Sequence, residues 1–316
     1  MSLIKYVIPP VPRHKLEAEL TQERFVRNTN KGQNKIYDFS AAEAPHLMLE
    51  VGRLRELTFR AAGGGTGKEI DVDEFDTSRI PYRQLVVWDP SNKEILGGYR
   101  YILCNQLRPV KEDIELLATA ELFHFSQQFL SEYLPYTIEL GRSFVQPHYQ
   151  SSKLGAKSLF ALDNLWDGLG SLIVDNPEMK YFFGKVTMYT DYNQEARDLI
   201  RVFMDIYFHD PQKLVYPIIA VESSIDENII REMFAGNNFS EDYKILSKKI
   251  RDLGENIPPL VNAYMSLSPS TKMFGTAVNE HFGGVEETGI IMTLKELYDV
   301  KVDRHIKTYN PNEKDD

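Results

Sequence analysis

The sequence predicts an α/β protein in which helices flank one mixed central sheet. Segments whose apolar residues recur with helical spacing alternate along the chain with short runs rich in β-branched and aromatic residues. Elements in this order pack as helices on the faces of a sheet. The composition, 42% hydrophobic and 26% charged, is that of a globular chain, and 316 residues allow one large domain or two ordinary ones.

The first expected helix begins after Ser40 and ends before Gly63. Ser40 can cap it, and Leu47, Val51 and Leu54 recur with helical spacing. An acidic segment, residues 69–76, follows the glycines that end this helix.

Two runs rich in β-forming residues come next, at 82–89 and 94–104. The turn residues Asp89-Pro90-Ser91-Asn92 separate them, so a β-hairpin is expected. We expect helix and loop at 116–133 and a strand at 136–145.

The pattern continues with a helix at about 153–173, a strand at 181–189 and an amphipathic helix at 193–208. Beyond Pro211 the sequence predicts a strand at 214–221, helices near 226–234 and 241–253, and a mixed segment through Ile291.

No clear linker or internal repeat divides the chain. We expect an N-terminal arm (residues 1–40), one core (41–210), a C-terminal extension packed on that core (211–309) and a frayed polar tail (310–316).

The charge balance of 36 Lys and Arg against 46 Asp and Glu gives a net charge of −10. Such a chain lacks the dominant positive field needed for bulk binding of nucleic acid, so no nucleic-acid partner is expected. Cys104 is the single cysteine, which excludes an intrachain disulfide and a cysteine-based zinc site and favours a reducing compartment.

The start of the chain has no long apolar core and no small-residue cleavage site, so we expect no signal peptide. The longest apolar run elsewhere, residues 214–221, contains Pro217 and falls far short of the ~20 residues that span a bilayer. We therefore expect a cytoplasmic protein that contacts the inner membrane face peripherally if it contacts a membrane at all.

Two motifs resemble known catalytic or binding motifs but depart from them in detail. The glycine-rich run at 63–68 lacks the first glycine of a phosphate loop, which is Ala62 here, and has Glu69 where Ser or Thr is needed. Gly141-Arg142-Ser143 lies within a predicted strand and lacks the second glycine of a serine-hydrolase turn.

Metal binding has little support in the sequence. The seven histidines include no His-x-His and no His-Glu-x-x-His, so no metal site is expected from them. Asp71, Asp73 and Asp76 are carboxylate candidates, but their spacing misses the calcium-loop pattern and a solvated acidic loop is expected.

Charged residues inside predicted strands are more informative. Glu139 and Arg142 lie three positions apart, so they point to opposite faces of a regular strand unless a bulge at Gly141 re-aims one of them. Arg100 is a second strand charge, with Asp73 and Asp76 as candidate counter-ions. A charge in an apolar strand needs a partner, so these residues form either a structural ion-pair network or a site.

These residues also carry a family resemblance. The motifs in chain order are Arg55-x-x-x-Phe59, Asp73-Glu74-Phe75-Asp76, Gly97-Gly98-Tyr99-Arg100 and Glu139-x-x-Arg142-x-x-Val145. The series resembles the autoinducer acyl-homoserine lactone synthases. It is more similar to the long-chain N-acyl amino acid synthases and the ornithine- or glycine-lipid N-acyltransferases of the GNAT superfamily, often labelled hemolysin-like.

The resemblance implies a GNAT-like acyl-CoA N-acyltransferase fold with an elaborated C-terminal part. In that fold the strand at 136–145 splays from the strand at 181–189, and the pantetheine arm of the acyl donor lies in the gap. Backbone groups at Ser143, Phe144 and Val145 would bind the arm and polarise the thioester carbonyl.

The phosphate of the donor would lie on the loop that follows this strand. The loop residues carried over from the family are Gln150, Lys153, Gly155 and Ala156. Lys153 stands where coenzyme A binders often have glycine, which favours acyl carrier protein as donor over coenzyme A.

The resemblance also implies roles for the charged residues. Glu139 would act as the base that deprotonates the acceptor amine, or would hold Arg142 or Arg100 in place. Arg100 and Arg142 would bind the acceptor carboxylate. Asp73 and Asp76 would orient those arginines or the acceptor ammonium, and the substrate site would include Arg55 and Phe59. Tyr189 or Tyr192 is a candidate acid for the leaving thiol.

The implied function is transfer of a long-chain fatty acyl group, with or without a 3-hydroxyl, to the α-amine of ornithine or glycine, which yields an aminolipid precursor. The donor would be the phosphopantetheine thioester of acyl carrier protein, or acyl-CoA, with no tightly bound cofactor. A carrier protein would need a local basic face, for which the candidates are Arg108, Lys111, Lys153 and Lys157.

Two alternatives stay open at this point. One is an autoinducer-like synthase of a diffusible acyl signal. The other is a non-catalytic binding or membrane-active protein, which the hemolysin-like label suggests but the lack of a pore-forming apolar segment disfavours.

Overall fold

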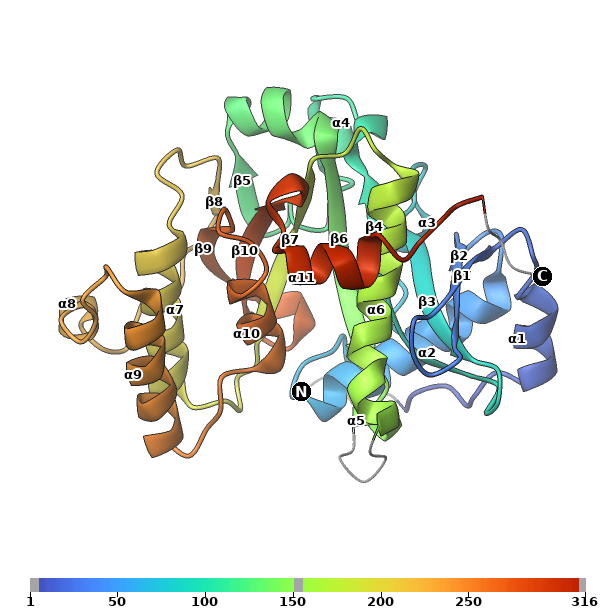
Figure 1. Cartoon of the computed structure of the whole chain (residues 1–316), viewed down its shortest axis with the longest axis horizontal. Coiled ribbons are helices and arrows are strands. Elements are labelled where there is room, and N and C mark those ends of the chain that lie inside the picture. The colour runs from blue at the N-terminus through green and yellow to red at the C-terminus, as the bar shows by residue number, and fades with distance from the viewer. Residues whose placement is uncertain (1–5, 151–155, 313–316) are drawn as a thin grey trace.

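The computed structural model describes residues 6–150 and 156–312 (Figure 1). Its strands are β1 (Phe25–Asn28), β2 (Lys35–Phe39), β3 (Arg83–Asp89), β4 (Glu94–Leu103), β5 (Phe123–Phe125), β6 (Thr137–Val145), β7 (Tyr181–Met188), β8 (Val215–Pro217), β9 (Lys272–Asn279) and β10 (Val285–Thr293). Its helices are α1 (Arg13–Glu19), α2 (Pro45–Ala61), α3 (Glu74–Thr77), α4 (Lys111–Ile114), α5 (Pro147–Gln150), α6 (Ala156–Asp175), α7 (Gln194–Phe208), α8 (Glu227–Arg231), α9 (Phe239–Asp252), α10 (Pro259–Met265) and α11 (Asp299–Lys301). Short turns of helix are η1 (Cys104–Gln106), η2 (Phe129–Tyr133), η3 (Leu134–Tyr136), η5 (Glu280–Phe282), η6 (Leu294–Glu296) and η7 (Val302–Ile306).

In the described part of the chain, eight strands form one sheet in the order β1-β2-β3-β4-β6-β7-β10-β9. Every neighbouring pair is antiparallel except β6 and β7, which run parallel. The predicted mixed sheet is confirmed. The hairpin and the strands at 136–145 and 181–189 are confirmed within one or two residues as β3, β4, β6 and β7.

The parallel pair β6–β7 separates halfway along its length. Pairing runs from Thr137 opposite Tyr181 to Leu140 opposite Gly184 and then stops. Beyond this point β6 keeps β4 as its partner, and β7 keeps β10. A wedge therefore opens between residues 141–145 and 185–188, as the resemblance implied.

A β-bulge lies at the start of this wedge. Arg100 pairs with Gly141, and Gly98 pairs with Phe144, so Tyr99 alone faces both Arg142 and Ser143. Arg142 has a φ of 50°, in the left-handed region that few residues other than glycine adopt. The bulge re-aims Arg142 and so brings it to the cavity that Glu139 also lines.

Helices cover both faces of the sheet, with α6 and α10 in front of it and α2 behind it in Figure 1. The C-terminal segment α11–η7 crosses α6. It approaches closely at Gly170, where a Cβ atom would lie 2.1 Å from the carbonyl oxygen of His305. Gly168 likewise lets α6 approach Leu85 and Tyr99 on the sheet. The position of the second half of α6 is thus set by packing on the sheet and on the C-terminal segment.

Several local expectations are corrected. The helix α2 begins at Pro45 with Ala44 as its N-cap, because Pro at the first position starts a helix well, and Ser40 lies in the preceding turn. The strand expected at 214–221 is shortened to Val215–Pro217, since Pro217 has no N–H to continue a ladder. The residues expected as an N-terminal arm contribute α1, β1 and β2. Within the described residues, every helix is too short or too polar to cross a bilayer.

Candidate active site

A cavity of about 920 Å³ opens where β6 and β7 diverge. It reaches both faces of the sheet because the gap between the strands connects them. Its charged lining residues are Arg100, Glu139, Arg142, Lys185, Asp191, Glu255 and Glu287. Beyond Leu140, β6 has no strand on its β7 side, so main-chain groups of residues 141–145 that point into the gap lack a strand partner there; the Val145 carbonyl accepts from the Gln150 side chain.

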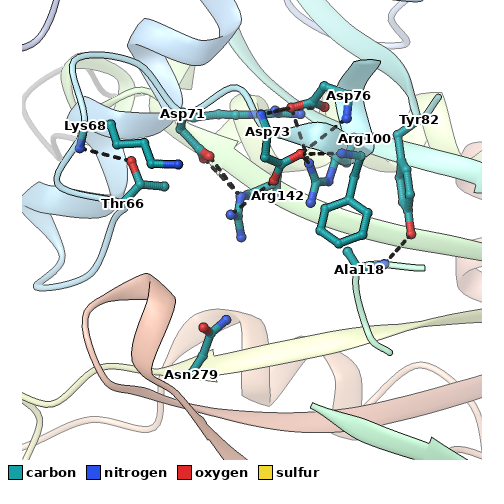
Figure 2. A network of polar contacts seen from close by, with 12 residues as sticks. Thr66, Lys68, Asp71, Asp73, Asp76, Tyr82, Arg100, Ala118, Arg142 and Asn279 are labelled. Carbon is teal, nitrogen blue, oxygen red and sulfur yellow. Dashed lines mark hydrogen bonds and ion pairs between the residues drawn. The ribbon is translucent and has the colours of Figure 1, made fainter. Parts of the chain in front are cut away.

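One wall is built on three arginines and three aspartates, which we call the arginine–aspartate network: Arg55, Arg100, Arg142, Asp71, Asp73 and Asp76. Figure 2 labels all of them except Arg55. Arg55 lies 3.1 Å from Asp76, and Arg100 lies 2.6 Å from Asp73 and 3.3 Å from Asp76. Arg142 lies 3.0 Å from Asp71.

Local structure places the carboxylates of this network. Asp73 caps α3 by accepting from the backbone N–H groups of Phe75 and Asp76, and Asp76 accepts from the N–H of Asp73 in return. The preceding loop packs directly on α2 at Gly52. A Cβ atom at this position would lie 2.5 Å from the Ile70 side chain and 2.7 Å from the Val72 side chain, so only glycine allows this approach. The expectation of a solvated acidic loop is therefore wrong, since Asp71 and Asp76 are fully buried.

The charges of the network stabilise one another. Burial alone would raise the pKa of Asp76, but the guanidiniums of Arg55 and Arg100 hold that pKa well below its usual range. Burial would lower the pKa of Arg100, but Asp76 and Asp73 raise it above its ordinary value. Asp76 and Arg100 therefore stay charged at neutral pH.

Glu139 is buried at the bottom of the wedge. The Tyr82 hydroxyl donates to it at 2.6 Å, the Thr119 hydroxyl at 2.7 Å and the Thr119 N–H at 3.2 Å. Burial raises the pKa of Glu139, and these hydrogen bonds together with the charge of Lys185 offset part of the rise. Among the described residues Glu139 has no ion pair with Arg100 or Arg142, so it does not hold either arginine.

Arg142 and Arg100 differ in how much of each side chain is available. Both line the cavity, but the Arg100 guanidinium is held by Asp73 and Asp76. Arg142 is held through Nε by Asp71 and stacks over Phe282 at 4.2 Å. Its Nη2 lies 3.6 Å from Asp73, and the end of the side chain faces the open space below the network in Figure 2.

A second polar cluster on the opposite wall was missed by sequence reasoning. Lys185 pairs with Glu287 at 2.7 Å, and the Asn279 side-chain amide donates to Glu287 at 2.9 Å. Burial would raise the pKa of Glu287, but Lys185 holds it below its ordinary value. Figure 2 shows Asn279 across the gap from Arg142. A charge inside an apolar strand, the signal that led to Glu139, also marks Lys185 and Glu287.

The remaining predicted residues divide into three groups. Phe59, Ser143, Phe144, Val145 and Gln150 line the cavity. Arg55, Asp73 and Asp76 lie behind its wall in the network. Ala156 begins α6, and Lys153 and Gly155 lie outside the described residues.

The two candidate acids, Tyr189 and Tyr192, both line the cavity. Burial raises the pKa of each to about 12, so both hydroxyls stay protonated at neutral pH. Asn193 caps α7 by accepting from the N–H of Ala196, which is a structural role.

Of the basic residues proposed for carrier docking, Lys153 lies outside the described residues, and Lys157 belongs to the first turn of α6. Lys111 begins α4, Arg108 precedes it and bonds Asp113, and α4 lies at the opposite end of α6 from α5 (Figure 1). Among the described residues, no cluster of His, Cys, Asp and Glu side chains has the arrangement of a metal site. The aspartates at 71–76 bind arginines instead.

Comparison with known proteins agrees with this geometry. A family model described as an acetyltransferase (GNAT) domain matches residues 54–158. A glycine N(alpha)-acyltransferase of Phocaeicola vulgatus is 52% identical over 303 residues, which cover 96% of this chain and 93% of that protein. Another glycine N(alpha)-acyltransferase, of Bacteroides thetaiotaomicron, is 55% identical over 305 residues, which cover 96% of this chain and 90% of that protein.

We expect Asp76→Asn to lower the free energy of unfolding by about 3–5 kcal/mol, because it leaves two buried guanidiniums undercompensated. Urea denaturation at pH 7 measures the change. In the native chain the stabilisation by Asp76 is present above its ordinary pKa of 3.8 and is lost as pH falls through the depressed pKa.

The matched control is Lys111→Ala, which removes an exposed pair with Glu115 and should change stability by less than about 0.5 kcal/mol. Equal, small effects of the two substitutions would contradict the structural role of the network.

Proposed function

This chain belongs to the GNAT N-acyltransferase family that includes these two glycine N(alpha)-acyltransferases, and from that premise we propose that it transfers a long-chain fatty acyl group from a pantetheine thioester to the α-amine of glycine. As a family member it is an amino acid N-acyltransferase. The observation that carries the proposal is the wedge between β6 and β7, which opens between a charged wall and an apolar one.

The proposed acceptor, glycine, binds through its carboxylate to Arg142. Arg142 is supported in this role by its place in the cavity wall and by the Asp71, Asp73 and Phe282 contacts that hold its plane. A guanidinium with two adjacent N–H groups binds a carboxylate by paired hydrogen bonds. Ornithine also carries an α-carboxylate, so it is the competing acceptor.

The proposed donor is an acyl thioester whose pantetheine arm lies along residues 143–145. Open main-chain groups of this segment would bind the arm's amides and polarise the thioester carbonyl. Acyl carrier protein is the first candidate because Lys153 replaces a glycine frequent in coenzyme A binders, and acyl-CoA is the second.

In the proposed reaction the glycine amine attacks the thioester carbonyl. The C–N bond forms, the C–S bond breaks, and the amine loses a proton to Glu139 directly or through one water. Burial raises the pKa of Glu139, which makes it a stronger base than an exposed glutamate. Tyr189 or Tyr192 is protonated at neutral pH and can give a proton to the leaving thiolate.

A lipid product favours peripheral contact with a membrane. Three apolar side chains on and after β8, Tyr216, Ile218 and Ile219, are solvent-exposed, and Ile219 has 78% of its surface exposed. They support such contact at this part of the C-terminal half.

We expect Glu139→Gln to reduce kcat/KM by at least about a hundredfold, because it removes the base while keeping the shape of the side chain. The base must be ionised, so kcat/KM of the native enzyme should rise with pH through a midpoint above 4.5, the ordinary glutamate pKa. Steady-state assays from pH 4 to 9 measure both. The control is Glu178→Gln, at an exposed position, which should leave kcat/KM and its pH midpoint unchanged. Near-native activity of a folded Glu139→Gln enzyme would show that Glu139 is not the base.

We expect Arg142→Ala to raise KM for glycine by about tenfold to a hundredfold with little change in KM for the donor, since one charge-assisted contact is lost. Glycinamide, which lacks the carboxylate charge, provides the matched control substrate. The native enzyme should prefer glycine strongly, and Arg142→Ala should lose most of that preference. An unchanged preference in Arg142→Ala would place the carboxylate elsewhere.

Lipid mass spectrometry of a bacterial host with and without the protein tests the reaction directly. We expect a new N-acylglycine whose mass identifies its acyl chain. Assays with purified acyl carrier protein or CoA thioesters then separate the two donors, with glycine, ornithine and S-adenosylmethionine as competing acceptors. Acylation of S-adenosylmethionine alone would favour the signal synthase, and no acylation of any acceptor would contradict the proposal.

A further inference from the structure

We propose that Tyr264 on α10 sets the length of the acyl chain that this enzyme accepts, by closing the apolar end of the cavity. The inference rests on the proposed function and adds a specificity determinant to it. Its basis is the division of the cavity into two lobes and the presence of a second, smaller cavity behind Tyr264.

The two lobes lie on opposite faces of the sheet because alternate residues of a strand point to opposite sides. On β7, Lys185 and Thr187 line the polar lobe, while Phe182, Val186 and Met188 belong to the hydrophobic core between the sheet and α6. On β10, Glu287 lies on the polar side, and Ile290 and Met292 on the apolar side. The apolar lobe is the part of the cavity suited to a hydrocarbon chain.

Two helices enclose this apolar lobe. The half of α6 facing it presents Leu162, Leu165, Trp166 and Leu169, at the three- and four-residue spacing of one helix face. Opposite it, α10 presents Leu260, Ala263 and Tyr264 with the same spacing. Figure 1 shows α10 beside α6 on the front of the sheet.

A small cavity of about 30 Å³ lies between these helix faces. Five residues line both it and the main cavity: Ser143, Leu162, Leu165, Leu260 and Tyr264. They therefore form the partition between the two cavities, and Tyr264 is the largest of them. The small cavity has about the volume of one water molecule, so an acyl chain that fills the main lobe stops at this partition.

Tyr264 is suited to be a movable part of the partition. Among the described residues its hydroxyl has no hydrogen-bond partner, so packing alone holds its ring. Burial raises the pKa of Tyr264 to about 12, so the ring brings no charge into the lobe. Since α10 lies outside the matched GNAT region, residues 54–158, chain length is set by the C-terminal part of the molecule.

The test is a chain-length series of acyl thioesters, from octanoyl to eicosanoyl, with saturating glycine. We expect Tyr264→Ala to join the two cavities and move the kcat/KM optimum to longer chains. Each added methylene that becomes buried is worth about fourfold in kcat/KM, the equivalent of about 0.8 kcal/mol. Leu162→Trp narrows the lobe on the α6 side and should move the optimum to shorter chains.

The control Tyr6→Ala removes a tyrosine that is 94% exposed and should leave the optimum unchanged, and KM for glycine should stay native in all three variants. Calorimetric binding of S-alkyl pantetheine thioethers reports the same lobe without catalysis. If the native enzyme acylates no glycine, the proposed function is contradicted. The thioether affinities would still test the role of Tyr264, because Tyr264→Ala should bind longer alkyl chains more tightly than the native enzyme does. The role of Tyr264 would be overturned if both folded variants, Tyr264→Ala and Leu162→Trp, kept the native chain-length preference and the native thioether affinity.

Discussion

The arginine–aspartate network is the constraint on which the rest of the site depends. Burying guanidiniums as completely as those of Arg55 and Arg100 is tolerable only with carboxylates in hydrogen-bonding range. Because the members come from α2, α3, β4, β6 and the loop before α3, their pairing fixes these elements relative to one another. The polar wall of the cavity is therefore held by charge pairing as well as by packing.

This constraint also explains the unusual backbone at Arg142. A regular strand would place Glu139 and Arg142 on opposite faces, and the bulge turns Arg142 toward Asp71 instead. The ion pair compensates for the left-handed φ, which is a strained conformation for a residue with a side chain. The bulge begins where β7 separates from β6. The distorted backbone at Arg142 and the wedge between β6 and β7 therefore start at the same point of β6.

The sheet separates two chemical environments that an acyl transfer to an amino acid must bring together. Charged groups lie on one face and an apolar lobe on the other, and the gap between β6 and β7 is the passage between them. Glu139 lies where these regions meet, on the paired part of β6 next to the gap. Its carboxylate is held by Tyr82 and Thr119 and thus keeps its position independently of the arginines.

The sequence by itself determined the α/β class, the hairpin, the strands beside the gap and the family, because each depends on local periodicity or on motifs contiguous in the chain. It also identified Glu139, Arg100 and Arg142, since a charge in an apolar strand is visible without coordinates. The tertiary structure alone decided which charges form ion pairs. Arg142 pairs with Asp71, and Lys185 on β7 pairs with Glu287 on β10, about a hundred residues later in the chain. The left-handed turn at Arg142 and the position of α10 against α6 likewise arise from contacts between distant segments, which local propensity does not encode.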